Sequence, residues 1–80
     1  MTEIDEIVEV GCIFKRGAVQ PVWMGWRGRR VPIERVTYHW QDTRGEVGVS
    51  LLTVTNGTDV FELEFNSKTL VWRLRKVYTD

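Results

Sequence analysis

The 80-residue chain has one cysteine, Cys12, and one histidine, His39. A single thiol cannot form a disulfide within the chain, which is typical of proteins in a reducing compartment. One thiol and one imidazole also fall short of the convergent ligand sets that hold zinc. We therefore predict a cytoplasmic protein with no metal site and no cofactor.

Long hydrophobic runs and an excess of charge of one sign are also missing. No apolar stretch approaches the roughly 18 residues that cross a bilayer, and no basic-then-apolar leader opens the chain. The 11 basic and 11 acidic residues give a formal net charge of zero. Because sequence-independent binding of nucleic acid relies on positive charge, the composition favours no particular partner, and it predicts no membrane association.

Apolar residues at helical spacing are absent as well. The chain instead contains short runs of β-branched and aromatic residues that glycine, asparagine and serine interrupt, a pattern typical of strands. We predict one all-β domain over residues 1–80, with five or six antiparallel strands in meander order. The first strand is expected over residues 7–14, and residues 1–6 are expected to fray or to form one short turn capped by Thr2.

Two turn signals predict a three-stranded meander over residues 47–77. Asn56-Gly57 is the strongest two-residue hairpin sequence, and as a two-residue loop it sets Leu52 opposite Phe61. A second tight turn at Ser67-Lys68 returns the chain so that the same apolar residues again share one face. Because a slip of one residue in either turn would break that agreement, the two signals support each other.

A further hairpin is predicted around Gly28-Arg29, where glycine in the first loop position favours a two-residue turn. This turn sets Trp26 opposite Val31. Farther along the chain the apolar alternation changes phase, and a β-bulge near Glu34-Arg35 would restore it. Residues 41–46 are polar and contain glycine, which predicts a loop.

The predicted strands carry apolar residues on one face, and that face must be covered. A small half-open barrel and a two-sheet sandwich both achieve this, and the pattern does not choose between them. The predicted core contains Val22, Met24, Trp26, Val31, Ile33, Val36, Trp40, Leu52, Val54, Phe61, Leu63, Phe65, Leu70, Trp72 and Leu74.

Residues 21–30 hold the candidate binding residues. The hairpin register turns Trp23 away from the core, and Arg27, Arg29 and Arg30 surround the turn. An outward indole flanked by guanidiniums can stack a nucleobase and hold phosphates. These four residues are therefore a candidate site for single-stranded nucleic acid or a partner protein. The alternative is that Trp23 is shielded by Arg27 through a cation–π contact, or by the N-terminal segment.

Signals of catalysis are weak. His39 has no nucleophile and orienting acid at a recognisable spacing, and Cys12 lies in an apolar run, as a small buried hydrophobe does. We predict no catalytic residues and no enzymatic activity. The meander register also turns Val49 and Leu51 outward. Our main hypothesis is a non-catalytic protein-interaction or accessory module that offers a sheet edge or outer face to a larger protein. Single-stranded nucleic-acid binding is the alternative, and an enzyme is a distant third.

The segment Trp26-Arg27-Gly28-Arg29-Arg30, followed by Val36 and Trp40 and closed by Trp72-Arg73-Leu74, resembles a small bacterial family of unknown function. Its members occur as short stand-alone proteins, and similar segments are appended to Y-family, lesion-bypass DNA polymerases. The similarity covers about residues 19–77, and the family has no established catalytic residues. It implies a compact β module whose partner belongs to DNA repair. The sequence departs from the family pattern at Met24, where phenylalanine is common, and at Val31, where tyrosine is common.

Overall fold

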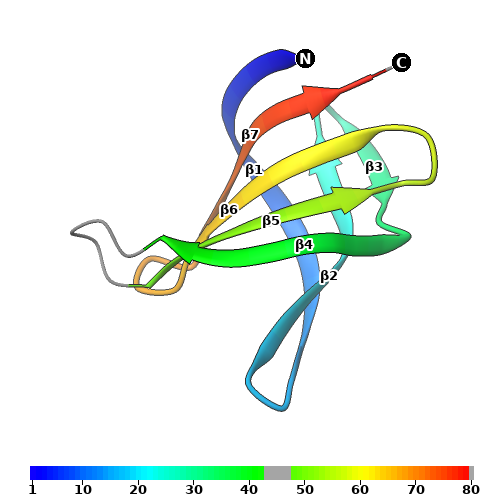
Figure 1. The fold of residues 1–80 in the computed structure, drawn as a ribbon. Helices are drawn as coiled ribbons and strands as arrows, with labels where there is room; N and C mark the ends of the chain where they lie inside the picture. Colours follow the sequence, from blue (N-terminus) through cyan, green and yellow to red (C-terminus); the bar gives the residue numbers. More distant parts are fainter. Residues whose placement is uncertain (43–47, 80) are drawn as a thin grey trace.

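The computed structural model describes residues 1–42 and 48–79 (Figure 1). Its seven strands are β1 (Thr2–Lys15), β2 (Ala18–Trp26), β3 (Arg29–Pro32), β4 (Arg35–Asp42), β5 (Val49–Thr55), β6 (Val60–Asn66) and β7 (Val71–Tyr78). All neighbours are antiparallel, in the order β3-β2-β1-β7-β6-β5-β4. The predicted all-β meander is confirmed, with seven strands instead of five or six.

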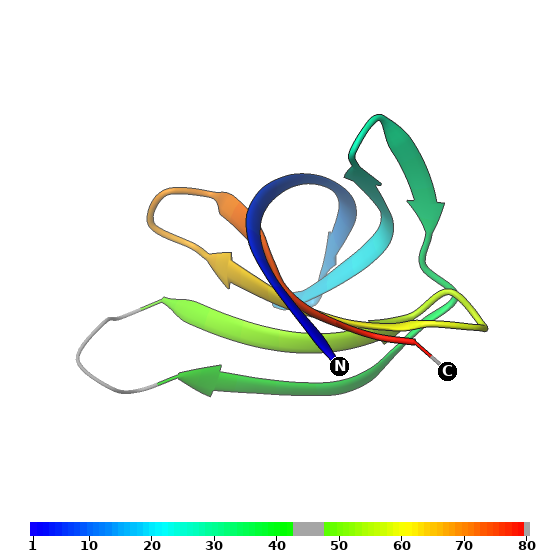
Figure 2. The same cartoon turned by 90° about the horizontal axis from the view of Figure 1, so that it is seen from above.

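The sheet curls on itself into a half-barrel, which is one of the two architectures that the sequence left open (Figure 2). β3 and β4 are consecutive in the chain, yet they form the two free ends of the sheet. Curling brings these ends near each other, so that Ile33 and Glu34 suffice to join them. None of the described residues belongs to a helix that is long and apolar enough to cross a membrane.

β1 is the longest strand and serves two neighbours in turn. Its first half pairs with β7 from Thr2 to Val8, and its second half pairs with β2 from Glu9 to Lys15. The prediction that residues 1–6 fray or form a short turn is therefore wrong, because Thr2 lies opposite Val77 in the sheet. Local signals could not reveal this pairing, since the partner strand lies at the other end of the chain.

The loop at Asn56-Gly57 has four residues instead of two, and this changes the strand register. The side-chain Oδ1 of Asn56 accepts hydrogen bonds from the backbone N–H groups of Thr58 (2.9 Å) and Asp59 (2.7 Å), as in an Asx turn. Leu52 consequently pairs with Leu63 and not with Phe61. A shift of two residues keeps every side chain on its predicted face.

The loop after β6 repeats this arrangement and removes Leu70 from the core. Asn66 Oδ1 accepts hydrogen bonds from the backbone N–H groups of Lys68 (2.9 Å) and Thr69 (3.2 Å). Leu70 closes this four-residue loop with a left-handed φ of 62° and is 70% exposed. The prediction of a buried Leu70 is therefore wrong, and Phe65 pairs with Trp72 in its place.

The third hairpin also turns earlier than predicted. Arg27 and Gly28 both have positive φ (51° and 76°), as the two central residues of a two-residue I′ turn require. Trp26 therefore pairs with Arg29, and Met24 pairs with Val31. The face of each side chain again survives because the shift is two residues.

The core lies on the concave face of the half-barrel. The buried apolar residues are Val8, Met24, Leu52, Val54, Phe61, Leu63, Phe65, Trp72, Leu74 and Val77, so Val8 and Val77 extend the predicted set. Trp26, Val31, Ile33 and Val36 are half-buried and contact this core.

Two β-bulges account for the other errors in the predicted core. One lies where Gly11 pairs with Trp23 and Cys12 pairs with Pro21, so that Val22 is the extra residue and is exposed. The other bulge follows Val36, later than the predicted position near Glu34-Arg35. An odd insertion reverses the alternation of a strand, and Trp40 consequently faces outward. Of the loop predicted over residues 41–46, the first two residues end β4, and 43–46 lie outside the described residues.

Candidate functional site

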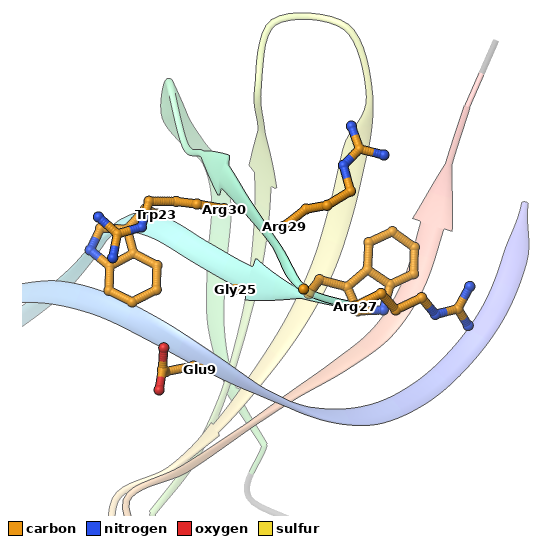
Figure 3. A pocket seen from close by; sticks show the side chains of 8 residues that line it. Glu9, Trp23, Gly25, Arg27, Arg29 and Arg30 are labelled. Carbon is orange, nitrogen blue, oxygen red and sulfur yellow. The ribbon is translucent and has the colours of Figure 1, made fainter.

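The four residues predicted as a binding site meet at one pocket. β2 and β3 carry Trp23, Arg29 and Arg30, and the turn between these strands carries Arg27. Together with Glu9 they line a hollow of about 360 Å³. Figure 3 shows Trp23 and Arg30 side by side in it, whereas Arg27 and Arg29 extend away from them. The predicted site residues are thus neighbours in space as well as in sequence.

The indole of Trp23 is partly covered by other residues of the domain. Its indole lies across Gly11 of β1, where even a methyl group would overlap the ring. The guanidinium carbon of Arg30 stands 4.1 Å from the indole centroid, a cation–π distance. Trp23 is therefore shielded in this structure, as the alternative interpretation expected. The cation–π partner is Arg30 and not Arg27, and the N-terminal strand contributes Gly11.

Arg27 is held by β1 through Glu6. Its Nη2 donates to Glu6 Oε2 at 2.7 Å, and the Nε1 of Trp26 donates to the other carboxylate oxygen at 3.2 Å. Arg27 also lies 4.7 Å above the Trp26 ring. The hydrogen bond from Arg27 lowers the pKa of Glu6 and raises the pKa of Arg27. The ion pair ties the tip of the hairpin to the first half of β1, although exposed pairs of this kind contribute little stability.

Arg29 faces a second hollow at the open end of the half-barrel. This cavity of about 290 Å³ is also lined by Trp26, Asp59, Phe61 and Val77. Within residues 1–42 and 48–79, Arg29 makes no ion pair. Of the three arginines, Arg29 is therefore the one that offers its guanidinium most directly to a ligand.

A second candidate surface lies on β4, where the predicted core included Trp40. Tyr38 and Trp40 are two residues apart on the strand and therefore share its outer face. Their ring centroids are 4.9 Å apart and their planes are tilted by 47°. Tyr38 is 63% exposed. Trp40 lies opposite Leu51, which is half-buried and faces outward as predicted. We call Tyr38, Trp40, Val49 and Leu51 the β4 patch.

The backbone of β4 adds to this patch. β4 is an end strand of the sheet and pairs with β5 on one side only. End strands present N–H and C=O groups that a further strand can pair with. A strict alternation of aromatic residues over Tyr38 and Trp40 was the signal that could have identified this surface, but the assumed bulge position assigned Trp40 to the core.

The side chains best suited to catalysis or metal binding, His39 and Cys12, lie on different strands. His39 is exposed on β4 and pairs with Leu52. Cys12 is half-buried on β1, and burial raises the pKa of its thiol, which disfavours the reactive thiolate. In the described ranges, no three His, Cys, Asp or Glu side chains converge in a way that could hold a metal ion.

Comparison of the chain with family models, with curated proteins and with solved structures found no match. The resemblance to polymerase-associated β modules therefore stays a prediction.

Proposed function

We propose that this domain is a non-catalytic protein-interaction module that binds its partner through β4. The observation that carries the proposal is the outward-facing pair of Tyr38 and Trp40, whose rings contact each other at a tilt on an end strand. Aromatic residues are enriched at protein interfaces, where Trp and Tyr often dominate the binding energy. Each also has a polar tip that can find a partner while its ring is covered.

The free backbone edge of β4 supports the same proposal. A partner strand that adds to β4 gains main-chain hydrogen bonds, and the alternating side chains of the β4 patch provide selectivity. Tyr38 and Trp40 would then contact the outward side chains of the added strand. The partner is proposed to be a larger protein of the reducing cytoplasm, and the sequence resemblance points to DNA-repair polymerases as the first class to test.

The experiment compares three immobilised versions of the domain in a lysate of the source organism. We expect a set of proteins retained by the wild type and by Tyr78→Ala but lost by the double variant Tyr38→Ala/Trp40→Ala. Tyr78 is an exposed aromatic residue on β7 and serves as the matched control. Equal retention by all three versions, each with a cooperative thermal transition, would contradict the proposal, as would retention of nothing specific.

A second candidate function is the binding of single-stranded nucleic acid at the arginine-lined pocket. The observation in its favour is that Trp23, Arg27, Arg29 and Arg30 line one hollow. A base could stack on Trp23 only after Arg30 leaves the indole, so Arg30 would exchange a ring contact for a phosphate contact.

Titration with mixed-sequence single-stranded DNA, followed by tryptophan fluorescence, separates the two functions. Nucleic-acid binding predicts quenching that weakens as salt rises and disappears in Trp23→Ala. An unchanged emission at low salt, with the domain folded, would eliminate this candidate and leave the β4 surface.

A further inference from the structure

β1 and β7 separate inside the sheet and leave a gap between them. Their pairing ends at Val8 opposite Trp72. β7 has only one residue before that point, whereas β1 continues for seven more residues, Glu9 to Lys15, which pair with β2 alone. Figure 1 shows the two strands side by side near the chain ends and diverging toward the hairpin tips. The second half of β1 therefore has an open backbone edge facing the loop that joins β6 to β7.

This gap is an apolar groove of about 410 Å³. Its walls include Val10, Cys12, Phe14, Phe65, Leu70 and Trp72. Phe14 is 64% exposed and Leu70 is 70% exposed, although the rings of Phe14 and Phe65 lie only 6.3 Å apart. A contiguous set of exposed large apolar side chains marks an interaction site more often than a random surface does.

The walls and the backbone edge together select the kind of occupant. A small apolar molecule would use the walls but not the N–H and C=O groups of β1. An extended polypeptide uses both, because its main chain can pair with β1 while alternate side chains enter the groove. The free length of β1 would accommodate about five to seven residues at roughly 3.3 Å each.

The surrounding charges define the ends of that occupant. Lys15 and Arg16 close the hairpin beside Phe14, and Lys68 lies in the loop that carries Leu70. These three side chains make no ion pair within the described residues. Basic residues therefore flank the end of the groove that Phe14 and Leu70 line, whereas Glu9 lines its other end, next to Val8. An occupant with acidic residues beside Phe14 and no negative charge beside Glu9 complements both ends.

We propose that this groove binds an extended peptide segment that pairs antiparallel with β1, with alternating apolar side chains preceded by acidic residues. Antiparallel pairing is the commoner arrangement, and it makes the peptide run in the direction of β7, with its N-terminal end beside Lys15. The groove and the β4 patch share no residue, so this interface is separate from the one proposed for the function of the domain.

The test uses the N-acetylated, C-terminally amidated peptide Glu-Glu-Val-Thr-Val-Thr-Val, which has no negative charge at the Glu9 end, and the rate at which iodoacetamide alkylates the thiol of Cys12. Cys12 lines the groove and is the only cysteine of the chain. We expect the peptide to slow alkylation in a saturable way. Replacing the two glutamates by lysines should weaken binding about tenfold through charge repulsion, and proline at the middle valine should abolish protection because it cannot donate to the ladder.

Variants of the protein locate the site. Phe14→Ala should lower the affinity for the peptide about tenfold or more, because it removes an aromatic anchor. Ile13→Ala, an exposed neighbour outside the groove, should change the affinity by less than about twofold. Leu70→Asn removes the apolar side chain from the opposite wall of the groove. Because asparagine tolerates the left-handed φ at this position, the variant should fold, and its affinity for the peptide should also be lost.

Three results would overturn the proposal. One is unchanged alkylation at millimolar peptide, and the second is an equal loss of affinity in Phe14→Ala and Ile13→Ala. The third is that Trp40→Ala no longer binds the peptide whereas Phe14→Ala still does. This result would assign the peptide to β4 and leave the groove without a ligand.

Discussion

The meander of β5, β6 and β7 differs sharply from the arm that β2, β3 and the second half of β1 form. The inward side chains of the meander are buried without exception from Leu52 to Val77, whereas the arm contributes Met24 as its only buried member of the apolar core. Figure 2 shows the arm curling over the meander at one end of the sheet. The meander therefore supplies most of the stabilising burial, whereas the arm holds Arg27, Arg29 and Arg30 together with the exposed apolar side chains of Ile13, Phe14 and Val22.

This difference has a physical cause. Each inward residue of the meander faces a covered surface, because the curl of the sheet closes over it. The hairpin of β1 and β2 extends beyond the end of that cover, so Phe14 stays largely exposed although its ring lies near that of Phe65. Regions with few buried apolar contacts open at lower free energy than the core, and binding segments are commonly drawn from such regions.

Replacing Trp72 by alanine tests the stronger half of the comparison and should have the largest effect. Trp72 is 6% exposed and its ring centroid lies 4.6 Å from that of Phe65. Loss of a buried tryptophan costs about 3–5 kcal/mol, which is a large part of the roughly 4–12 kcal/mol expected for a domain of this size. Urea unfolding followed by circular dichroism should show a greatly lowered midpoint, and a midpoint near that of the wild type would mean that the meander does not dominate stability.

Met24→Ala tests whether the arm is cooperative with the meander. Met24 is fully buried, and its truncation should cost about 2–5 kcal/mol. We expect hydrogen exchange to accelerate first in β2 and β3, with β5 to β7 retaining their protection. Val22→Ala on the same strand removes an exposed side chain and should cost about 0.5 kcal/mol or less. Uniform acceleration over all strands would instead show a single cooperative unit.

Gly11→Ala tests the attachment of Trp23 to β1. A methyl group at Gly11 would overlap the indole, whereas one at Gly25 would make ordinary contact with Trp23 (3.5 Å) and Glu9 (3.6 Å). Overpacking of this kind costs about 1–3 kcal/mol, and the displaced indole should change the tryptophan emission. Gly25→Ala is the matched control and should leave the emission unchanged. Identical spectra for the two variants would argue against close packing of Trp23 on Gly11.

Acid titration tests the weakest link, the ion pair between Glu6 and Arg27. The pKa of Glu6 is lowered by its hydrogen bond from Arg27, so the folded state favours the ionised carboxylate. This contribution is present above the ordinary carboxyl pKa of about 4.3, and it is lost as the pH falls through the lowered value. Stability of the wild type should therefore drop more than that of Glu6→Gln over this range. Parallel pH profiles in urea unfolding would show that the pair is energetically silent.

The candidate surfaces differ in how far the sequence predicts them. Trp23 and the three arginines line one hollow because they lie within one hairpin, where turn chemistry fixes their neighbourhood, and their binding role stays a prediction. The groove beside Phe14 was not predicted, since it depends on where β7 begins relative to β1. The β4 patch was missed because one bulge reverses the face of every later residue on that strand.

The sequence by itself determined the strand class, the approximate turn positions and the faces of most apolar residues. These follow from short-range chemistry, namely β-branched composition, asparagine–glycine turns and the two-residue period of a strand. Errors of two residues in register left the faces unchanged for the same reason. Only the tertiary structure decided that Thr2 pairs with Val77, that Gly11 receives the Trp23 ring and that Trp40 faces outward. The first two depend on contacts between residues apart in the chain, which local patterns do not encode. The third depends on the exact position of a single-residue bulge, which the change of phase in the sequence indicates only approximately.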